Sequence, residues 1–293
     1  MAKSLAHAWG QVMGGIFEST FYDMLSRVAD EEGVYLDYNG NDRAADCGVR
    51  SSGGKLAWRD QDDNWHQLDF VFERGGTEGR VGVPLAFVEI AWRRYTKHSK
   101  NKAQEIEGAL LPIAQAHRHL RPFLGAIVGG VFTKPSITQL TSRGLTLIYV
   151  PYADVVDAFA SVGIDADYGE HTKESEYKKK LAAFQKLSPA KRLQLQKAIV
   201  ASAKKQIGVF VKSLRASIAR QVVAIVVLPL HGESKEIGNL ADAIAFISGY
   251  TDDKGSRGPV VRYDVEVRFS NGAAIKGEFP TKAEATAFLR SLE

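Results

Sequence analysis

Apolar side chains in the first 170 residues follow two spacings, one typical of helices and one typical of strands. From Leu5 to Glu32 they recur every three or four positions, which predicts one long helix with a weak point at Gly14-Gly15. The later apolar runs are shorter and are bounded by Gly, Pro, Asn or Asp, as strands commonly are. The strands predicted in this way cover residues 34–38, 46–50, 55–59, 65–72, 85–92, 124–132 and 145–150.

Helical spacing returns between the later strands. Ser99 is the expected N-cap of the first of these helices, which places Lys100 and Lys102 in its first turn. Strands that alternate with helices after an initial helix and hairpin are typical of an α/β fold with a mixed central sheet flanked by helices. The helices predicted in this part cover residues 99–119, 136–142 and 155–162.

Residues 171 to 220 are helix-forming and strongly basic. They hold 13 Lys and Arg but only two acids, a net charge of +11 in a chain whose total is +4. Helices are predicted at 174–187 and 190–218, on either side of Ser188-Pro189. Such a concentration of charge indicates a surface that faces a polyanion, most commonly nucleic acid, and a solvated helical face is the alternative.

The end of the chain has the pattern of a small α+β unit. A strand is predicted at 222–228 and a helix at 237–247, followed by a hairpin about Asn271-Gly272. Thr281 and Glu284 then form a capping box that opens a last helix. The domains expected are an α/β core at 1–168, the basic helical segment at 169–221 and this α+β unit at 222–293.

Composition narrows the function classes. The chain has 293 residues, of which 45% are apolar and 25% charged, which is ordinary for a globular protein with a full core. Cys47 is the only cysteine, so the sequence excludes an internal disulfide and a multi-cysteine zinc site and favours a reducing compartment. We expect a cytoplasmic protein without a membrane span, because the sequence has neither a long apolar run nor the pattern of a signal peptide.

Two acids interrupt apolar strands, and they are the leading candidates for chemistry. Asp69 and Glu89 each lie within a predicted strand that is otherwise largely apolar. A carboxylate is costly to bury without a partner, so both need a reason to be there. A shared divalent cation is one such reason, because hard oxygen ligands suit Mg²⁺. Ion pairs with Arg93 or Arg94 are the structural alternative.

The order of these acids resembles that of a known family. A helix bearing Glu18, a strand bearing Asp69, a strand bearing Glu89 and a further helix resemble the PD-(D/E)XK nuclease superfamily over about residues 10–160. This is the fold of most type II restriction endonucleases. The resemblance implies a restriction-endonuclease-like fold in which Asp69 and Glu89 hold Mg²⁺, with Mn²⁺ able to replace it.

The sequence departs from that superfamily in two places. Leu68 stands before Asp69, where a proline is common, and Ala91 replaces the motif lysine. Within the superfamily this lysine can lie on the following helix instead. The resemblance therefore makes Lys102 the first candidate and Lys100 the second. For either one, the structural alternative is a first-turn lysine exposed to solvent.

Other residues complete the candidate site. Glu18 would assist the two acids from the first helix, unless it is a boundary residue at the edge of that helix's buried face. Gln104 and Glu105 follow the candidate lysines and could hydrogen-bond or bind the metal. The basic helices and the run after Glu89 would hold the DNA backbone. The candidates for DNA contacts are Arg93, Arg94, Lys97, Lys178, Lys179, Lys180, Lys191 and Arg192.

The resemblance predicts a Mg²⁺-dependent endonuclease that acts on double-stranded DNA, in the simplest case a sequence-specific type II restriction enzyme. Cutting both strands at a symmetric site requires two active sites, so a homodimer is expected. Two alternatives stay open. One is a structure-specific nuclease of DNA repair or recombination. The other is a DNA-binding protein of the same fold that has lost activity, for which Ala91 is the motivating feature.

Overall fold

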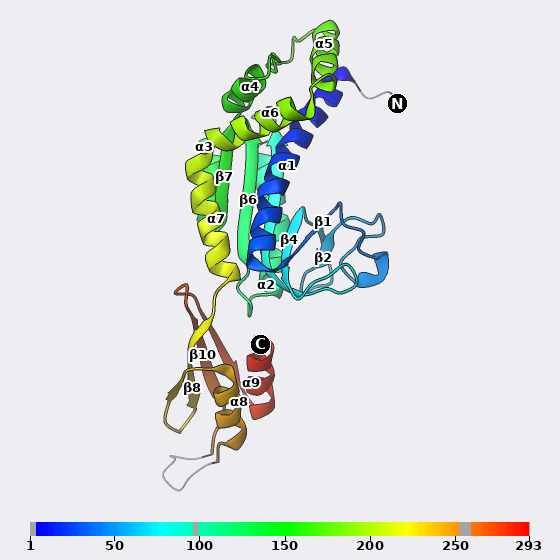
Figure 1. Ribbon diagram of the computed structural model, residues 1–293. Coiled ribbons are helices and arrows are strands. Elements are labelled where there is room, and N and C mark those ends of the chain that lie inside the picture. Colours follow the sequence, from blue (N-terminus) through cyan, green and yellow to red (C-terminus); the bar gives the residue numbers. More distant parts are fainter. Residues whose placement is uncertain (1–3, 96–98, 252–258, 293) are drawn as a thin grey trace. The chain divides into compact units, whose positions relative to one another are not determined.

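The chain forms two compact units in a computed structural model that describes residues 4–95, 99–251 and 259–292. The first unit comprises residues 1–118 and 122–215, and the second comprises 119–121 and 216–293 (Figure 1). Of the basic segment expected at 169–221, residues 169–215 belong by their contacts to the first unit and residues 216–221 to the second. None of the helices in the described ranges is both long and apolar enough to cross a bilayer.

A five-stranded mixed sheet forms the centre of the first unit. Its strand order is β1-β4-β5-β6-β7, in which the first three strands pair antiparallel and the last three pair parallel. This confirms the α/β class with a mixed sheet flanked by helices. The strands are β1 (Tyr35–Tyr38), β4 (Phe70–Arg74), β5 (Val83–Arg93), β6 (Phe123–Gly130) and β7 (Thr146–Pro151).

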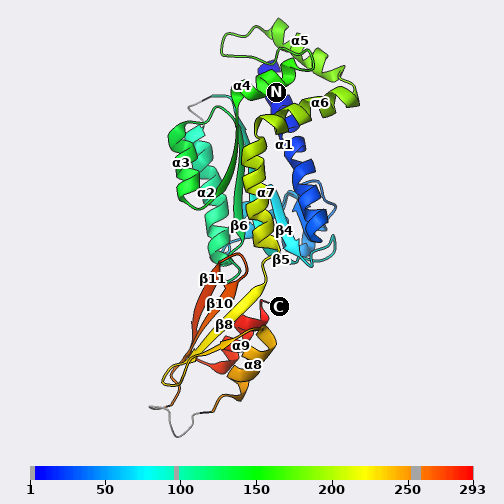
Figure 2. The same ribbon diagram turned by 60° about the vertical axis from the view of Figure 1, so that its left-hand side comes forward.

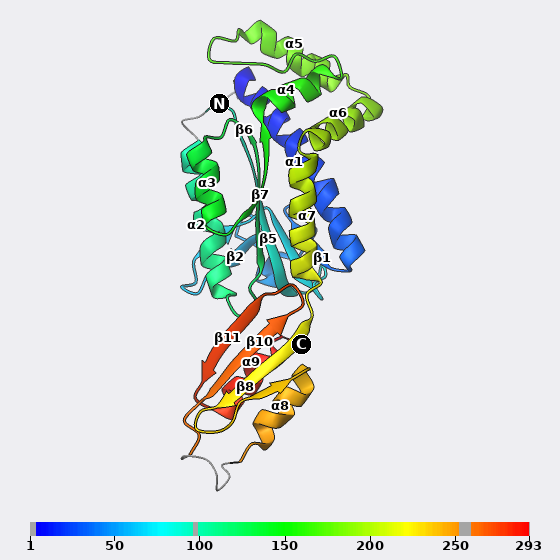
Figure 3. The same ribbon diagram turned by 90° about the vertical axis from the view of Figure 1, so that its left-hand side faces the viewer.

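Helices cover both faces of this sheet (Figure 3). Gly125 and Gly129 of β6 lie under Phe210 and Phe17, and a Cβ at either glycine would come within 2.6 Å of the ring above it. The glycines therefore let two helices pack closely on one face of the sheet. The helices on that face are α1 (Leu5–Glu32) and α7 (Lys204–Ile218), and those on the other are α2 (Ser99–Ala116) and α3 (Lys134–Ser142).

Three further helices complete the first unit. The helix predicted at 190–218 is wrong as one element, because α6 and α7 are separate helices with a turn at Ala203. Tertiary packing accounts for the break, since α6 lies against α1 and α4 while α7 packs on the sheet. The hydroxyl of Ser188 caps α6 as expected, accepting from the Lys191 amide at 3.3 Å. The bounds are α4 (Tyr152–Ala160), α5 (Glu174–Gln185) and α6 (Pro189–Ser202).

The strand predicted at 65–72 is two strands in different sheets. β3 (Trp65–Gln67) pairs only with β2 (Ala57–Arg59) in a small hairpin, and β4 belongs to the main sheet. The amide of buried Leu68 donates a hydrogen bond to the Leu56 carbonyl at 3.1 Å. The chain bends at the next residue, Asp69, which lies between the two strands. Asp69 therefore precedes β4 and does not lie inside a strand.

Two smaller expectations about this part of the chain were also wrong. The strand predicted at 46–50 is replaced by a short 3₁₀ helix, η1 (Ala45–Cys47). Arg50 then forms an isolated bridge with Leu56. The α2 helix ends at Ala116, before the predicted end at residue 119, and it runs through Pro112. The Ser99 side chain and residues 96–98 lie outside the described part of the chain. The N-cap expected at Ser99 therefore stays a prediction.

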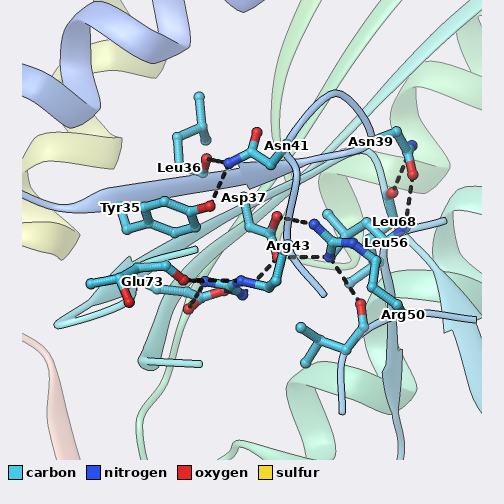
Figure 4. A network of polar contacts seen from close by, with 12 residues as sticks. Tyr35, Leu36, Asp37, Asn39, Asn41, Arg43, Arg50, Leu56, Leu68 and Glu73 are labelled. Atoms are coloured by element: carbon cyan, nitrogen blue, oxygen red, sulfur yellow. Dashed lines mark hydrogen bonds and ion pairs between the residues drawn. The ribbon is translucent and has the colours of Figure 1, made fainter. Parts of the chain in front are cut away.

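A buried ionic network fastens β1, β4 and the loop between them (Figure 4). The guanidinium of Arg43 lies 2.7 Å from both Asp37 and Glu73, and all three side chains are fully buried. Arg50 holds the other oxygen of Asp37 at 2.6 Å. Arg43 also donates to the carbonyls of Thr77 and Arg80 in the turn after β4, which anchors that turn. The charges are thus paired within the network, as buried ions require.

The second unit is an antiparallel sheet in the order β11-β10-β8-β9 with two helices on one face (Figure 2). The helix predicted at 237–247 begins at Leu240, because Ile237 ends the short strand β9. Thr281 and Glu284 form the predicted capping box. The elements are β8 (Val222–Pro229), β9 (Lys235–Ile237), α8 (Leu240–Gly249), β10 (Tyr263–Phe269), β11 (Ala274–Phe279) and α9 (Lys282–Arg290).

Candidate functional site

Asp69 and Glu89 meet at the end of the β4–β5 ladder. The antiparallel register pairs Phe70 with Val88, so the next pair along is Asp69 opposite Glu89. The Asp69 amide donates to Glu89 Oε1 at 3.2 Å, and the Ile90 amide donates to Asp69 Oδ2 at 2.8 Å. Carboxylate oxygens thus accept from two backbone amides just beyond the last paired residues of the ladder. Each acid is positioned by the backbone around the other.

A cleft of about 410 Å³ opens where β4 separates from β5. Within the described chain, β5 continues beyond Glu89 to Arg93 with β6 as its paired neighbour. Every residue of β5 from Ile90 to Arg93 lines the cleft, which therefore runs along this length of the strand. The lining residues are His7, Gly10, Gln11, Gly14 and Glu18 of α1, Ile90 to Arg94, Lys102 of α2, and Tyr168.

One stripe of α1 forms a wall of the cleft. His7, Gln11, Gly14 and Glu18 are spaced by three or four residues and so lie on one side of the helix. A Cβ on Gly14 would stand 3.9 Å from the Cβ of Trp92, an ordinary contact distance, so α1 lies against β5 at this position. The helix is continuous here, contrary to the predicted weak point. Glu18 is exposed, lies next to the buried Phe17 of the same helix, and lines the cleft.

The acids of the site have raised pKa values. Burial, reinforced by the charge of Asp69, raises the pKa of Glu89 well above its usual range. Burial likewise raises the pKa of Asp69, although the hydrogen bond from Ile90 opposes this change. Partial desolvation and the charge of Asp69 raise the pKa of Glu18. The positive charge of Lys102 lowers the pKa of Asp69 and of Glu89 but does not cancel the increase in either.

This donor set fits a hard divalent cation. Mg²⁺ is usually bound through one or two carboxylates and keeps several waters, so Asp69 and Glu89 supply enough protein ligands. Burial is the main cause of the raised pKa values of the two acids, and a divalent cation would add positive charge to that of Lys102 beside them. No group of three or more His, Cys, Asp or Glu side chains in the described ranges is arranged to hold a metal ion.

Of the two candidate lysines, Lys102 is the one whose positive charge acts on both acids. Its side chain is mostly buried and lines the cleft, and its amine lies 3.2 Å from Glu105 Oε2. Lys100 is exposed and does not line the cleft. Arg93 lines the cleft and lies 3.6 Å from the same Glu105 oxygen, so Glu105 holds two cations at the rim. Gln104 is exposed and does not line the cleft.

The position of the missing motif lysine is occupied by a core residue. Ala91 is 3% exposed and belongs to the apolar cluster that contains Ala103 and Ile106 of α2. A long cationic side chain at Ala91 would have to displace this packing. Arg93 forms its ion pair with Glu105, and Arg94 forms its ion pair with Asp167. Among the described side chains, neither arginine is paired with Asp69 or Glu89, so the alternative in which ion pairs explain the two acids is not observed.

Three of the DNA-contact candidates are held in structural interactions. The guanidinium of Arg94 lies 3.9 Å from the Tyr152 ring centroid and donates to the Tyr168 carbonyl. Lys180 is buried and lies 3.0 Å from Asp165. Arg192 stacks over Phe184 and donates to carbonyls at the end of α5. Lys178, Lys179 and Lys191 are exposed, and Lys97 lies outside the described residues.

Sequence reasoning missed three residues that line the cleft, His7, Gln11 and Tyr168. The first two carried a usable signal, because they share the helical stripe of Glu18. Tyr168 had none, since it reaches the cleft only through the tertiary fold. The Tyr168 carbonyl accepts a hydrogen bond from the guanidinium of Arg94, the residue directly after β5, and this contact holds Tyr168 beside the strand.

No protein-family model matches this chain, and no curated protein matches it either. A solved structure described as that of AF1548, a protein of unknown function, aligns with 14% identity and a TM-score of 0.27. The alignment covers 66% of this chain and 98% of that chain. A likeness at this TM-score carries no argument, so the functional conclusion depends on the geometry of the site.

Proposed function

We propose that this protein is a Mg²⁺-dependent endonuclease that hydrolyses phosphodiester bonds of double-stranded DNA. The observation that carries the proposal is the Asp69–Glu89 pair, which is fixed by reciprocal backbone hydrogen bonds. The pair does not itself line the cleft but adjoins it through Ile90, which lines it together with Lys102. The order α1, β4, β5, α2, with Glu18 on α1, Asp69 directly before β4 and Glu89 within β5, also follows the order of the PD-(D/E)XK resemblance.

The residues of the cleft have distinct roles in this proposal. Asp69 and Glu89 hold Mg²⁺, which when bound supplies activation of water and neutralisation of charge on the phosphate. Lys102 presents its ammonium to the same opening, where it stabilises negative charge that develops on the phosphoryl oxygens. Glu18 faces the opening from α1 and, with its raised pKa, is suited to hold a proton or orient a water there.

The cost of burying these two acids favours an enzyme over a DNA-binding protein that has lost activity. Buried carboxylates with raised pKa values reduce the stability of the folded protein at neutral pH. A protein that only binds DNA would gain stability by replacing them with neutral residues.

A sequence-specific restriction enzyme acting as a homodimer is the form of nuclease that we propose. A structure-specific nuclease is the second candidate.

A cleavage assay on long duplex DNA tests the proposal and separates its forms. With Mg²⁺, discrete fragments support a restriction enzyme, whereas smearing or selective cutting of junctions and flaps supports a structure-specific nuclease. Binding without any cutting, with Mg²⁺ or Mn²⁺ present, contradicts both. The same reactions in EDTA provide the control for metal dependence.

The two candidate lysines are expected to differ in their effect on cleavage. Lys102→Met removes the cation at the acids and should slow single-turnover cleavage by about 10²- to 10³-fold, the loss typical of a group that stabilises transition-state charge. Lys100→Met removes an equal charge from the same helical turn but from an exposed position, so its rate should stay within about threefold. If both variants lost the same amount of cleavage rate, the effect would come from the net charge of the helical turn and not from Lys102 itself.

Stability in EDTA should depend on pH through the acid pair. Because the folded-state pKa values are raised, the pair favours folding at pH below the ordinary carboxyl range, and this contribution is lost as pH rises through the raised values. Glu89→Gln should therefore match the wild type near pH 4 and melt about 2–4 °C higher at pH 8, the shift that ~1 kcal/mol produces in a domain of this size.

Mg²⁺ provides the matching test at pH 8. It should raise the melting temperature of the wild type but not that of Glu89→Gln, because only a site that binds the ion gains stability from it. A pH-independent difference between the two proteins, or an equal response to Mg²⁺, counts against the assignment of Glu89 as a metal ligand.

A further inference from the structure

The outer face of α7 carries a compact group of lysines around a glycine. Lys204, Lys205 and Lys212 are all exposed, and they stand four and three residues before Gly208 and four after it. Residues at these spacings are neighbours on a helix surface, so the three side chains surround the glycine. We call this group the α7 lysine face. The opposite side of α7 is anchored in the core by Phe210 and Leu214.

The glycine at the centre of this face has no packing role. Gly208 is exposed, and no atom of a neighbouring residue lies within 4 Å of the position where its Cβ would be. Glycine is the least favourable helix residue apart from proline, so an exposed position in mid-helix would ordinarily gain from alanine. Gly125 and Gly129, by contrast, are required by the rings above them. A ligand that approaches the helix backbone closely would explain why glycine occupies this position.

The charge of the face is not compensated. The sequence has no Asp or Glu between residues 177 and 232, a stretch that includes all of α6 and α7. Among the described residues, none of the three lysines takes part in an ion pair with an acid. Arg215, further along α7, does pair with Glu31. The uncompensated part of α7 is therefore the part that surrounds Gly208.

We propose that the α7 lysine face binds the phosphate backbone of duplex DNA, at a place separate from the cleft. This rests on the proposed function for its choice of polyanion. Lys204 and Lys212 are about 12 Å apart along the helix axis, whereas one DNA strand places a phosphate about every 3.4 Å of duplex axis. The face therefore spans several phosphates, and Gly208 lets the strand approach between the lysines.

The α7 lysine face positions DNA without reading its sequence. Lysine is a compact point charge, and contacts to phosphate carry no direct sequence information. Gln206, the one amide side chain on this part of α7, is held by both the amide and the carbonyl of Tyr149 on the edge strand β7. The α7 lysine face should therefore contribute equally to binding of every DNA sequence.

Salt dependence of binding tests the charge. The protein with Glu89→Gln in EDTA, which prevents cutting, is titrated with duplexes of unrelated sequence at several salt concentrations. Adding Lys204→Gln, Lys205→Gln and Lys212→Gln together should reduce the slope of log affinity against log salt by about 2.7, because each phosphate that a lysine neutralises adds about 0.9 to that slope. Affinity at low salt should fall at least tenfold for every duplex. The matched control replaces three exposed lysines elsewhere, Lys55, Lys134 and Lys276.

A substitution that leaves charge unchanged tests the glycine. Gly208→Leu fills the space between the lysines, and we expect it to weaken duplex binding about fivefold or more while the melting temperature is unchanged or higher. Gly208→Ala should show a smaller loss of binding. If both variants melt higher and bind as tightly as the parent, the glycine has no role in DNA binding.

The outcomes separate this proposal from the proposed function. An unchanged salt slope in the triple lysine variant overturns the α7 lysine face, even if the wild type cleaves DNA. A reduced slope supports it, even if no cleavage is ever seen. Vesicles containing phosphatidylserine are tested in parallel, and lysine-dependent binding to them without binding to duplexes overturns the choice of DNA as the ligand.

Discussion

Replacing Glu89 with Gln should lower the rate of Mg²⁺-dependent cleavage by at least ~10³-fold. The amide oxygen can still accept the hydrogen bond from the Asp69 backbone, so the fold is retained while the charge that holds the metal is lost. Asp69→Asn should have a similar effect, because its amide oxygen can still accept from Ile90. The double variant should be little worse than either single one, since both acids serve one ion. Single-turnover cleavage at saturating Mg²⁺ is the measurement.

Duplex binding in EDTA separates this effect from weaker binding of DNA. Affinity should stay within about threefold of the wild type, because neither acid is placed to touch phosphate without the metal. Glu278→Gln is the control for removal of one carboxylate, since Glu278 is exposed on β11 and such changes are usually near neutral. Our assignment of the site would be wrong if Asp69→Ala cut DNA at the wild-type rate.

Removing Arg43 should cost about 3–5 kcal/mol of unfolding free energy, the range for breaking a fully buried ion pair by deleting one partner. Arg43→Ala would leave Glu73 without its guanidinium and Asp37 with only Arg50. It would also free the Thr77 and Arg80 carbonyls of the turn after β4. Urea unfolding of the wild type and the variant should show this as a lower midpoint with an unchanged slope.

An arginine at the surface provides the control for this substitution. Arg59 pairs with Asp63 at 3.2 Å, but its side chain is 52% exposed, so Arg59→Ala should change stability by less than about 0.5 kcal/mol. If Arg43→Ala lost no more stability than Arg59→Ala, the network would not be what fastens β1 to β4. Glu89→Gln is expected to move stability in the opposite direction at pH 8, because that acid has no such partner.

Local patterns were enough to predict most of the secondary structure. The period of α1, the capping box at Thr281 and the buried run of β5 each depend on residues close together in sequence, so they are visible before folding. The break between α6 and α7 and the bend at Asp69 are different. Each occurs where the chain passes from one packing surface to another, and nothing in the local spacing marks that change.

The candidate site was predictable in part for the same reason. Asp69 and Glu89 are conspicuous because carboxylates are expensive in apolar strands, and that is a property of sequence. The choice of Lys102 over Lys100 needed the orientation of α2 against the sheet. Lys180 and Arg192 were read as surface charges, whereas the fold holds both in intramolecular contacts. Charge can be read from sequence, but burial depends on what packs nearby.

Sequence by itself determined the α/β class, the two acids and the basic character of residues 171–220, since each depends on residue type and short-range spacing. Tertiary structure alone decided that the acids face each other at the end of a ladder, that the charge of Lys102 acts on both, and that the glycine among the α7 lysines is exposed. The reason is that residues far apart in sequence form a hydrogen bond, interact electrostatically or lie on the same surface only when the strands and helices pack.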